Sequence, residues 1–449
     1  MKYKDTDIQW LGKIPEHWKL DRIKDKTINV VGGDWGSDPE SESKGENIVV
    51  LRVSDLDDIY FSYDDLTIRK IKESSIKNRK INENCLIIEK SGGGEKQLVG
   101  RVGYPKELSV DAISSNFMAK IEFDNSVDLR FVNYMFSSLY TSKLNFPFVQ
   151  QTTGIQNLNV GYYLTTKVAF PPKKEQIAIA NYLDKACERI DKIVKIKEMQ
   201  LQNMDANTES LINEFVTGKK TLKAHKEYKT SNIEWLGDIP KSWDLKRLFN
   251  ICYFIRGNSS FKKDELLDEG KYVALQYGKT YKVDEVNEEF KFYVNENFYK
   301  SSQVVNYGDV IFVSTSETLE DLGHSVFYNR NDIGLIGGEQ ILIKPKNTIL
   351  DGKYLFYTTR VFGKELKKYA TGLKVFRFDT YDLKNIYVPI PPIEEQKAIA
   401  KQLDESIAKT EKIKTIIQKQ IKTLKNYRKS LIHECVTGKK QVVAQTPIS

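Results

Sequence analysis

The chain has 449 residues, and its 69 Lys and Arg against 61 Asp and Glu give a formal net charge of +8. Hydrophobic residues make up 40% and aromatic residues 11%, which excludes disorder as a description of the whole chain, because these side chains suffice for several cores. The longest apolar runs, such as Val310–Val313, are too short for a membrane-spanning helix.

The first five residues are charged from Lys2 onward and lack the apolar stretch of a secretory signal, so we expect a cytoplasmic protein. The four cysteines lie tens of residues apart and form no C-x-x-C pair: Cys85, Cys187, Cys252 and Cys435. This spacing favours buried free thiols over disulfides or a zinc site, and we expect no metal.

The first element is a short segment, residues 3–23, that recurs 225 positions later as residues 228–248. Both copies read Tyr-Lys-x3-Ile-x-Trp-Leu-Gly-x-Ile-Pro-x2-Trp-x-Leu-x-Arg, with 11 identities in 21 positions. Four of the five Trp residues occupy matched positions, Trp10 with Trp235 and Trp18 with Trp243. The match predicts an internal duplication, and we call the repeated parts the frame.

Each half then contains an insert, residues 24–169 or 249–389, and the two inserts share almost no sequence. Short β-branched runs bounded by Gly, Asn, Asp or Pro predict strands in both inserts. These runs are 47–53, 85–88, 272–275, 309–313 and 341–343. A helical stretch is predicted near 128–145 in one insert and near 351–369 in the other. The sequence therefore predicts one frame that holds two different inserts.

After each insert, the sequence Pro-Pro-x2-Glu-Gln-x-Ala-Ile-Ala begins at residue 171 and again at residue 391. Apolar residues then recur at three- and four-residue spacings without an interior Gly or Pro. This pattern predicts two helices, 173–217 and 393–437, with Gly218 and Gly438 as their C-terminal stops. A helix of about 40 residues is roughly 60 Å long, so we expect the two helices to pack together as a coiled coil.

The predicted fold class is α/β (α+β), with two globular domains separated by two long antiparallel coiled-coil helices in a pseudo-two-fold repeat. Residues 1–172 and 221–390 form the globular domains, each with its own frame segment. Residues 173–220 and 391–440 form the conserved long helices, and residues 441–449 form a tail.

Catalytic motifs are missing from the sequence. It contains no G-x-x-x-x-G-K-[ST] phosphate loop, no G-x-G-x-x-G after a strand and no [DNS]-P-P-[YF] motif of base methyltransferases. His433-Glu434-Cys435 has suitable residue types for a catalytic or metal site, but the first copy has Asn213-Glu214-Phe215 at these positions. We therefore predict no catalytic residue and no metal ligand.

Polar loops in the inserts are better candidates, because they combine cations, amides and glycines. Arg and Lys suit guanine, Asn and Gln suit adenine, and backbone N–H groups near Gly suit phosphate. The candidate DNA-binding residues of the first insert are Lys90, Ser91, Lys96, Gln97, Gln151, Thr153, Gly154, Gln156 and Asn157. Those of the second insert are Thr371, Gly372, Lys374 and Arg377. A solvated polar loop is the alternative for any one of them.

The repeated frame and its two dissimilar inserts together resemble the specificity subunit of type I restriction-modification systems, and the resemblance covers both halves. It implies that residues 19–170 and 244–389 are target recognition domains, each reading one half of a bipartite, asymmetric DNA site. The helices would set the spacer and dock methyltransferase subunits. The residues expected to form the frame and the partner interface are Trp10, Trp18, Glu175, Gln176, Trp235, Trp243, Glu395 and Gln396.

The same resemblance implies partners and cofactors. The partners would be double-stranded DNA, two modification (methyltransferase) subunits and restriction subunits with a motor and a nuclease. The chain itself would be a non-catalytic subunit without a cofactor, since S-adenosylmethionine, ATP and Mg would be bound by the partner subunits. Two alternatives stay open: a specificity-like scaffold that reads no bases, and a stand-alone DNA methyltransferase or nuclease.

The positive charge is concentrated at the end of the chain. Residues 391–449 contain 12 Lys and Arg against 6 Asp and Glu, which leaves an excess of 12−6 = +6, whereas residues 1–172 have 23−24 = −1. This excess could face unread DNA between the half-sites or an acidic partner surface.

Overall fold

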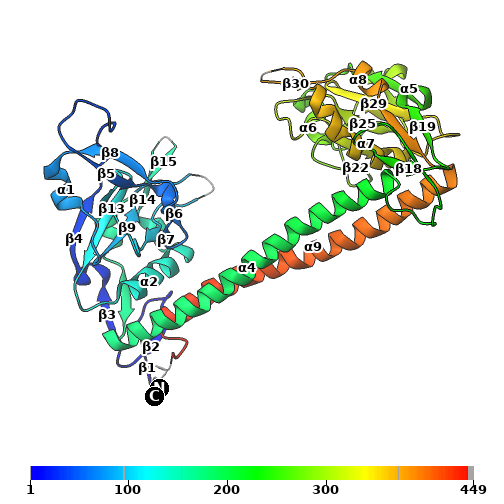
Figure 1. Cartoon of the computed structure of the whole chain (residues 1–449). Coiled ribbons are helices and arrows are strands. Elements are labelled where there is room, and N and C mark those ends of the chain that lie inside the picture. Colours follow the sequence, from blue (N-terminus) through cyan, green and yellow to red (C-terminus); the bar gives the residue numbers. More distant parts are fainter. Residues whose placement is uncertain (1, 95–96, 153, 373, 443–449) are drawn as a thin grey trace. The chain divides into compact units, whose positions relative to one another are not determined.

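The computed structural model describes residues 2–94, 97–152, 154–372 and 374–442. The chain forms two compact units (Figure 1). The first unit contains Met1–Glu198 and Gln418–Ser449, and the second contains Met199–Ile417. This division cuts each long helix in two, whereas the predicted domains keep each helix whole. The predicted domain boundaries stay a prediction.

The two long helices are present where the Pro-Pro sequences predict them. Helix α4 spans Lys173–Val216 and α9 spans Ile393–Val436, each with 44 residues, which is about 66 Å of helix. Gly218 and Gly438 follow with φ of +75° and +74°, the left-handed conformation that ends a helix. Among the described residues no helix is long and apolar enough to cross a membrane.

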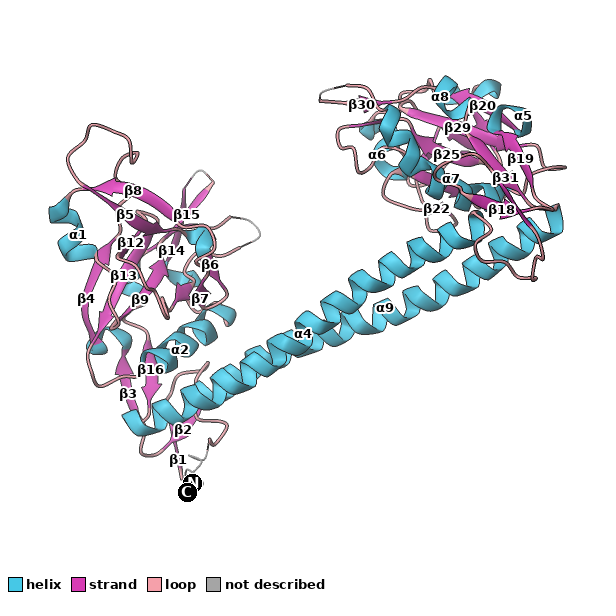
Figure 2. Cartoon of the chain, viewed as in Figure 1, coloured by secondary structure: helices cyan, strands magenta, loops and turns pink. Residues whose placement is uncertain are grey.

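The first unit is built on a four-stranded antiparallel sheet and a three-stranded mixed sheet (Figure 2). The four-stranded sheet has the order β11 (Val102–Gly103), β9 (Cys85–Glu89), β13 (Met118–Phe123), β4 (Thr27–Gly32). The other has the order β12 (Ala112–Ser114), β5 (Glu46–Leu51), β8 (Thr67–Ile71), with β12 parallel to β5. Strand β9 is buried along its whole length, as expected of its apolar residues 85–88 in the interior of a sheet, and its last residue, Glu89, is buried too.

The second unit repeats this strand order. Its larger sheet runs β27 (Ser325–Tyr328), β25 (Val310–Val313), β29 (Gln340–Pro345), β20 (Cys252–Arg256), and β22 (Glu285–Val286) extends it beyond β27. Its other sheet pairs β28 (Gly334–Ile336) parallel to β21 (Tyr272–Leu275), with β23 (Tyr293–Val294) and β24 (Val304–Val305) at the edges. The two inserts therefore differ in sequence but share a topology, which the sequence comparison did not reveal.

Each unit also contains the predicted helix before the Thr-Gly loop. Helix α2 spans Leu129–Thr141 and α7 spans Gly352–Leu366. Both begin at an aspartate whose carboxylate accepts hydrogen bonds from backbone N–H groups of the first turn, Asp128 in one and Asp351 in the other. The apolar face of α7 packs on the core of the second unit through Phe356 and Phe362.

The remaining elements are short. The frame segments form two two-stranded sheets in each unit: β1 (Tyr3–Asp5) with β2 (Lys13–Pro15) and β3 (Lys19–Arg22) with β16 (Lys167–Phe170), then β17 (Tyr228–Thr230) with β18 (Asp238–Pro240) and β19 (Asp244–Arg247) with β31 (Tyr387–Ile390). The first unit adds β6 (Leu56–Asp57), β7 (Tyr60–Phe61), α1 (Glu73–Arg79) and α3 (Val160–Tyr163). The second unit adds α5 (Leu248–Ile251), α6 (Tyr277–Thr280) and α8 (Thr380–Lys384).

Buried glutamines join each globule to the start of a long helix. In the first unit, Gln176 of α4 accepts a hydrogen bond from the backbone N–H of Asp128 at 2.8 Å and donates to the Pro171 carbonyl at 2.9 Å. In the second unit, Gln396 of α9 accepts from the backbone N–H of Asp351 at 2.9 Å. These amides hold the N-terminus of α2 or α7 against the frame.

Within each unit the two long helices run antiparallel and pair by charge. In the first unit, Glu198 pairs with Lys425 at 2.9 Å and Asp191 with Arg428 at 3.1 Å. In the second unit, Asp205 pairs with Lys414 at 2.7 Å. Each of these ion pairs between helices takes its acid from α4 and its base from α9. Part of the basic excess of α9 is thus matched by carboxylates of α4.

Candidate nucleic-acid interface

The structure brings the two predicted polar segments of the first insert together in one small sheet. Strands β14 (Val149–Thr152) and β15 (Ile155–Leu158) form a hairpin, and β15 pairs with β10 (Ser91–Gly92). Ser91 lies opposite Asn157, and its hydroxyl donates to the Asn157 amide oxygen at 2.7 Å. Gly154 has a φ of +81°, and among the described residues no atom lies within 4 Å of where its Cβ would be. Gly154 is exposed.

The predicted residues of this sheet differ in how free their side chains are. Gln156 is 7% exposed, accepts a hydrogen bond from the backbone N–H of Val99 at 3.0 Å and donates to the Gly94 carbonyl at 3.2 Å. Its amide thus holds the loop after β10. Gln97, Gln151 and Asn157 are exposed, and Lys90 is half-buried. Lys96 and Thr153 lie outside the described residues. The reading of bases by this set stays a prediction.

In the second unit, the strand after the Thr-Gly loop also pairs with a short strand that follows the central strand of the larger sheet. Strand β26 (Thr315–Ser316), which comes after β25 in the chain, pairs with β30 (Phe376–Arg377). The backbone N–H groups of Thr371 and Arg377 donate to each other's carbonyls at 2.9 Å. Gly372 has a φ of +115°, and a Cβ there would lie 2.0 Å from the Val375 carbonyl, so glycine is required. Thr371, Gly372, Lys374 and Arg377 are all exposed.

A hollow of about 360 Å³ lies beside β10 in the first unit, among the loops that follow β4, β5, β9 and β12. Its lining includes Trp35, Arg52, Glu89, Ser91, Asn116 and Phe117. Of these only Ser91 was among the predicted residues. Trp35 offered a signal, because it is the one Trp outside the repeated frame.

Charged groups in the hollow are held by partners. Glu89 is 1% exposed, and Arg101 Nε donates to its Oε2 at 3.2 Å. Burial raises the pKa of Glu89, while the Arg101 guanidinium opposes this shift. Arg52 is engaged by Asp55, with 2.9 Å between Nε and Oδ1. The hollow is thus a built pocket with a buried acceptor and aromatic side chains at its wall.

The repeated Trp and Glu residues of the frame form joints inside each unit. Trp18 is 1% exposed, and its indole N–H donates to Glu175 Oε1 at 3.0 Å. In the second unit, Glu395 instead contacts His225 Nε2 at 3.1 Å, and the ring of His225 packs edge-on against the fully buried Trp243. Gln176 and Gln396 are buried too, so these residues stabilise the frame from inside.

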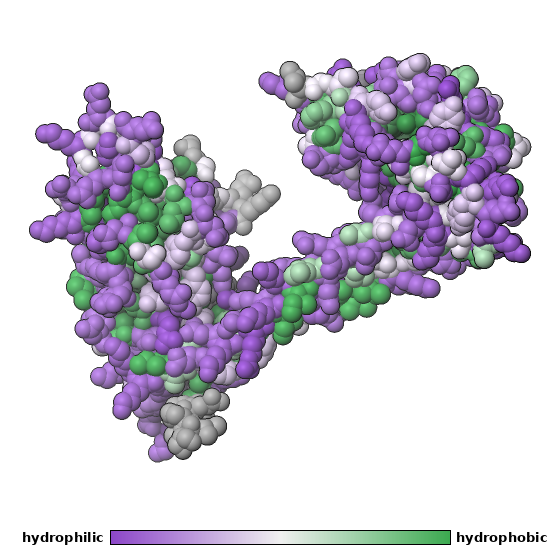
Figure 3. All heavy atoms as spheres, in the orientation of Figure 1, coloured by the Kyte–Doolittle hydropathy of each residue, from purple (hydrophilic) through white to green (hydrophobic). Residues whose placement is uncertain are grey.

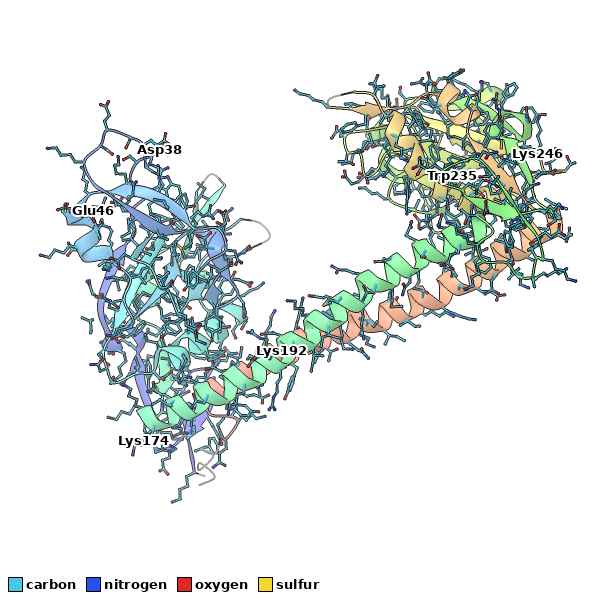
Figure 4. All side chains as sticks on the ribbon, in the orientation of Figure 1. Asp38, Glu46, Lys174, Lys192, Trp235 and Lys246 are labelled. Carbon is cyan, nitrogen blue, oxygen red and sulfur yellow. The ribbon has the colours of Figure 1, made fainter. Side chains whose placement is uncertain are left out.

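Four of the predicted frame residues are partly exposed: Trp10, Trp235, Glu175 and Glu395. Trp235, labelled in Figure 4, lines a second hollow together with Glu209 of α4 and Arg360 and Lys364 of α7. Glu209 accepts from Arg360 at 2.9 Å and pairs with Lys364 at 2.6 Å. A contact of Trp10 or Trp235 with a partner subunit stays a prediction.

Apolar side chains are exposed on the long helices, and Figure 3 shows apolar areas along them. On α4 within the first unit, Ile193 is 43% and Ile196 56% exposed. On α9 within the second unit, Ile413 and Ile416 are 49% and 56% exposed. These pairs are 220 positions apart, which is the repeat offset of the helices, so the duplication presents the same apolar pair twice.

The four cysteines are free thiols and buried, as the spacing predicts. Burial raises the pKa of Cys85 to about 11 and that of Cys435 to about 12, so neither thiol is a ready nucleophile. In the part of the chain that the structure describes, no group of three or more His, Cys, Asp or Glu residues is placed to hold a metal ion.

The sequence matches one protein family. Residues 240–423 match the family model of the type I restriction modification DNA specificity domain. The MjaVIII specificity subunit of a type I restriction enzyme from Methanocaldococcus jannaschii is 25% identical, over 98% of this chain and 97% of that protein. The EcoKI specificity subunit from Escherichia coli is 23% identical over 45% of this chain and 44% of its own length.

The fold matches solved structures as well. A chain from a structural study of complex assembly and conformational transition in a type I R-M system gives a TM-score of 0.72 at 16% identity, covering 95% of this chain and 99% of that one. The HsdS subunit from Thermoanaerobacter tengcongensis gives a TM-score of 0.54 at 16% identity, covering 95% of this chain and 98% of that one. The family model over residues 240–423, the relatives that match almost the whole chain and the repeated frame together make this chain similar to the specificity subunits of type I restriction-modification systems.

Proposed function

We propose that each unit of this chain reads one half of a bipartite, asymmetric DNA site. The observation that carries the proposal is that one strand order recurs in both units, while the side chains around the Thr-Gly loops differ. The first unit offers Gln151 and Asn157, and the second offers Lys374 and Arg377. Amides suit adenine and cations suit guanine or phosphate, so the two units would select different half-sites.

The long helices would set the spacer between the half-sites. Each helix is continuous over 44 residues and contributes to both units, and ion pairs fix its partner within each unit. Inserting seven residues into both helices adds about two turns, roughly 10 Å, or about three base pairs at 3.4 Å each. The half-site bases should stay the same, because the recognition loops are untouched.

The helices would also dock two methyltransferase subunits, and restriction subunits would join the complex. The support is the exposed apolar pair that the duplication repeats on α4 and α9, since a repeated surface fits two copies of one partner. S-adenosylmethionine, ATP and Mg would be bound by those partners. The complex would act on DNA in the cytoplasm.

Methylome sequencing of cells that express the chain with its methyltransferase partner tests the proposal. We expect one bipartite motif for the wild-type chain, and the same half-sites with a longer spacer after insertion into both helices. A specificity-like scaffold would yield no motif. Altered half-site bases with an unchanged spacer would contradict the role of the helices.

A further inference from the structure

The hollow beside β10 has the chemistry of a nucleobase pocket. It contains an aromatic wall, Trp35 and Phe117, and a carboxylate, Glu89, that is 1% exposed. Phe117 is 42% exposed, and it stands in the turn between β12 and β13. At about 360 Å³ the hollow can hold a single base, which offers a flat ring for aromatic contact.

The hollow is kept open next to the carboxylate. Gly92 has a φ of +134°, and a Cβ there would lie 3.0 Å from Glu89 Oε1. Because glycines form this wall, no side chain covers Oε1 from that direction. Arg101 Nε donates to the other oxygen, Oε2, at 3.2 Å and holds the carboxylate in place.

The hollow also borders the residues proposed to contact DNA. Ser91 lines it and pairs with Asn157 of the hairpin, so a base in the hollow would lie next to the hairpin surface. Trp35 is fixed by the guanidinium of Arg69, which lies over its ring at 4.9 Å. The aromatic wall is therefore supported before a ligand arrives.

We propose that this hollow receives one amino-bearing nucleobase, cytosine, adenine or guanine, from the DNA half-site read by the first unit. The base ring packs against Trp35 and Phe117, and its exocyclic amino group donates to Glu89. A carboxylate accepts hydrogen bonds only, so the base has to turn an N–H edge and not a carbonyl toward Glu89. Since Glu89 is 1% exposed, a base paired within the duplex cannot reach it, and the base has to leave the stack.

The pocket is a property of the first unit. Glu89 lies opposite Met118 in the sheet, and the corresponding position of the second unit, opposite Gln340, is Val313. Valine accepts no hydrogen bond, so the second unit has no carboxylate at this position. The inference rests on the proposed function and adds that one base of one half-site is read inside the protein.

The test uses the complex of the full chain with its methyltransferase partner. In a Glu89→Gln variant the amide keeps the shape of the carboxylate but can also donate a hydrogen bond. We expect the methylome to show one relaxed position in one half-site, where a base that presents a carbonyl to the amide is accepted as well, with all other positions unchanged. An unchanged motif would overturn the proposal.

A second variant keeps the test valid if Glu89→Gln does not fold. Phe117→Ala removes an exposed ring, and we expect binding of a duplex with the wild-type motif to weaken roughly 5- to 150-fold, the loss of one base–aromatic stack. Tyr162→Ala is the matched control, because Tyr162 is 67% exposed and does not belong to the lining of the hollow. Equal effects of both variants would contradict the pocket.

A displaced base leaves its partner in the other strand unpaired, and reagents for unpaired bases detect that partner: permanganate for thymine, kethoxal for guanine and chloroacetaldehyde for cytosine. We expect the wild-type complex to make one base opposite the first half-site reactive, and Phe117→Ala to abolish that reactivity. A wild-type complex in which no base of this half-site becomes reactive would refute displacement. A wild-type chain that yields no motif at all would instead refute the proposed function, so the two failures are distinguishable.

Discussion

The contact of Arg428 with the first unit gives a prediction whose size follows from the structure. Arg428 of α9 pairs with Asp58 at 2.6 Å, in the turn between β6 and β7, and with Asp191 of α4 at 3.1 Å. The Arg428 side chain is 13% exposed, whereas both aspartates are 54% exposed. Replacing Arg428 by alanine therefore leaves two carboxylates near each other without their cation.

The expected cost combines two effects. Hydrogen bonds to charged groups contribute about 1.5–3 kcal/mol, but pairs with exposed partners contribute only about 0–1 kcal/mol each. With a buried cation and half-exposed acids, we expect Arg428→Ala to cost about 2 kcal/mol. The β6–β7 hairpin should then open roughly 30-fold more often.

Hydrogen–deuterium exchange of the full chain measures this effect locally. We expect amides in residues 53–63 to exchange about 30-fold faster in Arg428→Ala, with strands β25 and β29 of the second unit unchanged. Thr208→Ala is the matched control, because Thr208 occupies the repeat-equivalent position of α4 and its hydroxyl donates to its own helix, to the Met204 carbonyl. Unchanged exchange in residues 53–63 would refute the assigned role of Arg428.

Three further changes test the frame. Gln396→Ala should destabilise the second unit by about 2–4 kcal/mol in thermal unfolding, because buried backbone groups lose their partner; a loss below about 0.5 kcal/mol would contradict this joint. Gly438→Ala should cost about 1–3 kcal/mol, since its Cβ would lie 2.4 Å from Pro15 Cδ, and should cost more than Gly154→Ala, whose Cβ would meet nothing within 4 Å. Burial lowers the pKa of His433 below its ordinary value of about 6.5, so the neutral ring stabilises the fold above that pH, and this stability is lost as the pH falls below it. His433→Asn should flatten this pH dependence of the free energy of unfolding. The same pH dependence in the variant and the wild type would refute the prediction.

Much of the frame was predictable because it depends on local signals. Both long helices were predicted to within one residue, because their ends depend on nearby residues in the chain. These residues are the Pro-Pro pair before each helix, the regularly spaced apolar residues within it, and the glycine after it, Gly218 or Gly438. The free, buried cysteines follow from spacing in the same way. The repeat itself needs only sequence identity.

The shared topology of the inserts could not be predicted, because it depends on which strands pair across long distances. Strand β13 pairs with both β9 and β4, and β29 pairs with both β25 and β20, although the paired residues differ in type between the two units. Burial in a sheet requires apolar residues at alternating or continuous positions but accepts many sequences. Sequence comparison alone therefore missed the similarity.

The candidate interface was predicted in part. The sequence identified Ser91 and the amide-rich hairpin, because amides and glycines cluster there along the chain. It did not identify Glu89, which looked like the end of a buried strand, or Asn116 and Phe117, which form an ordinary turn. These residues meet only when four separate strands end at the same edge of the fold. In the folded chain the amide of Gln156 hydrogen-bonds to backbone groups of the loop after β10, so it is not free to contact a base.

The most direct test of the whole account is the methylome of a hybrid chain. Residues 19–170 are replaced by the corresponding domain of another specificity subunit with a known motif, and the hybrid is expressed with the methyltransferase partner. We expect a motif with one new half-site, one unchanged half-site and an unchanged spacer. A hybrid motif in which both half-sites change would contradict the central claim that each unit reads DNA independently.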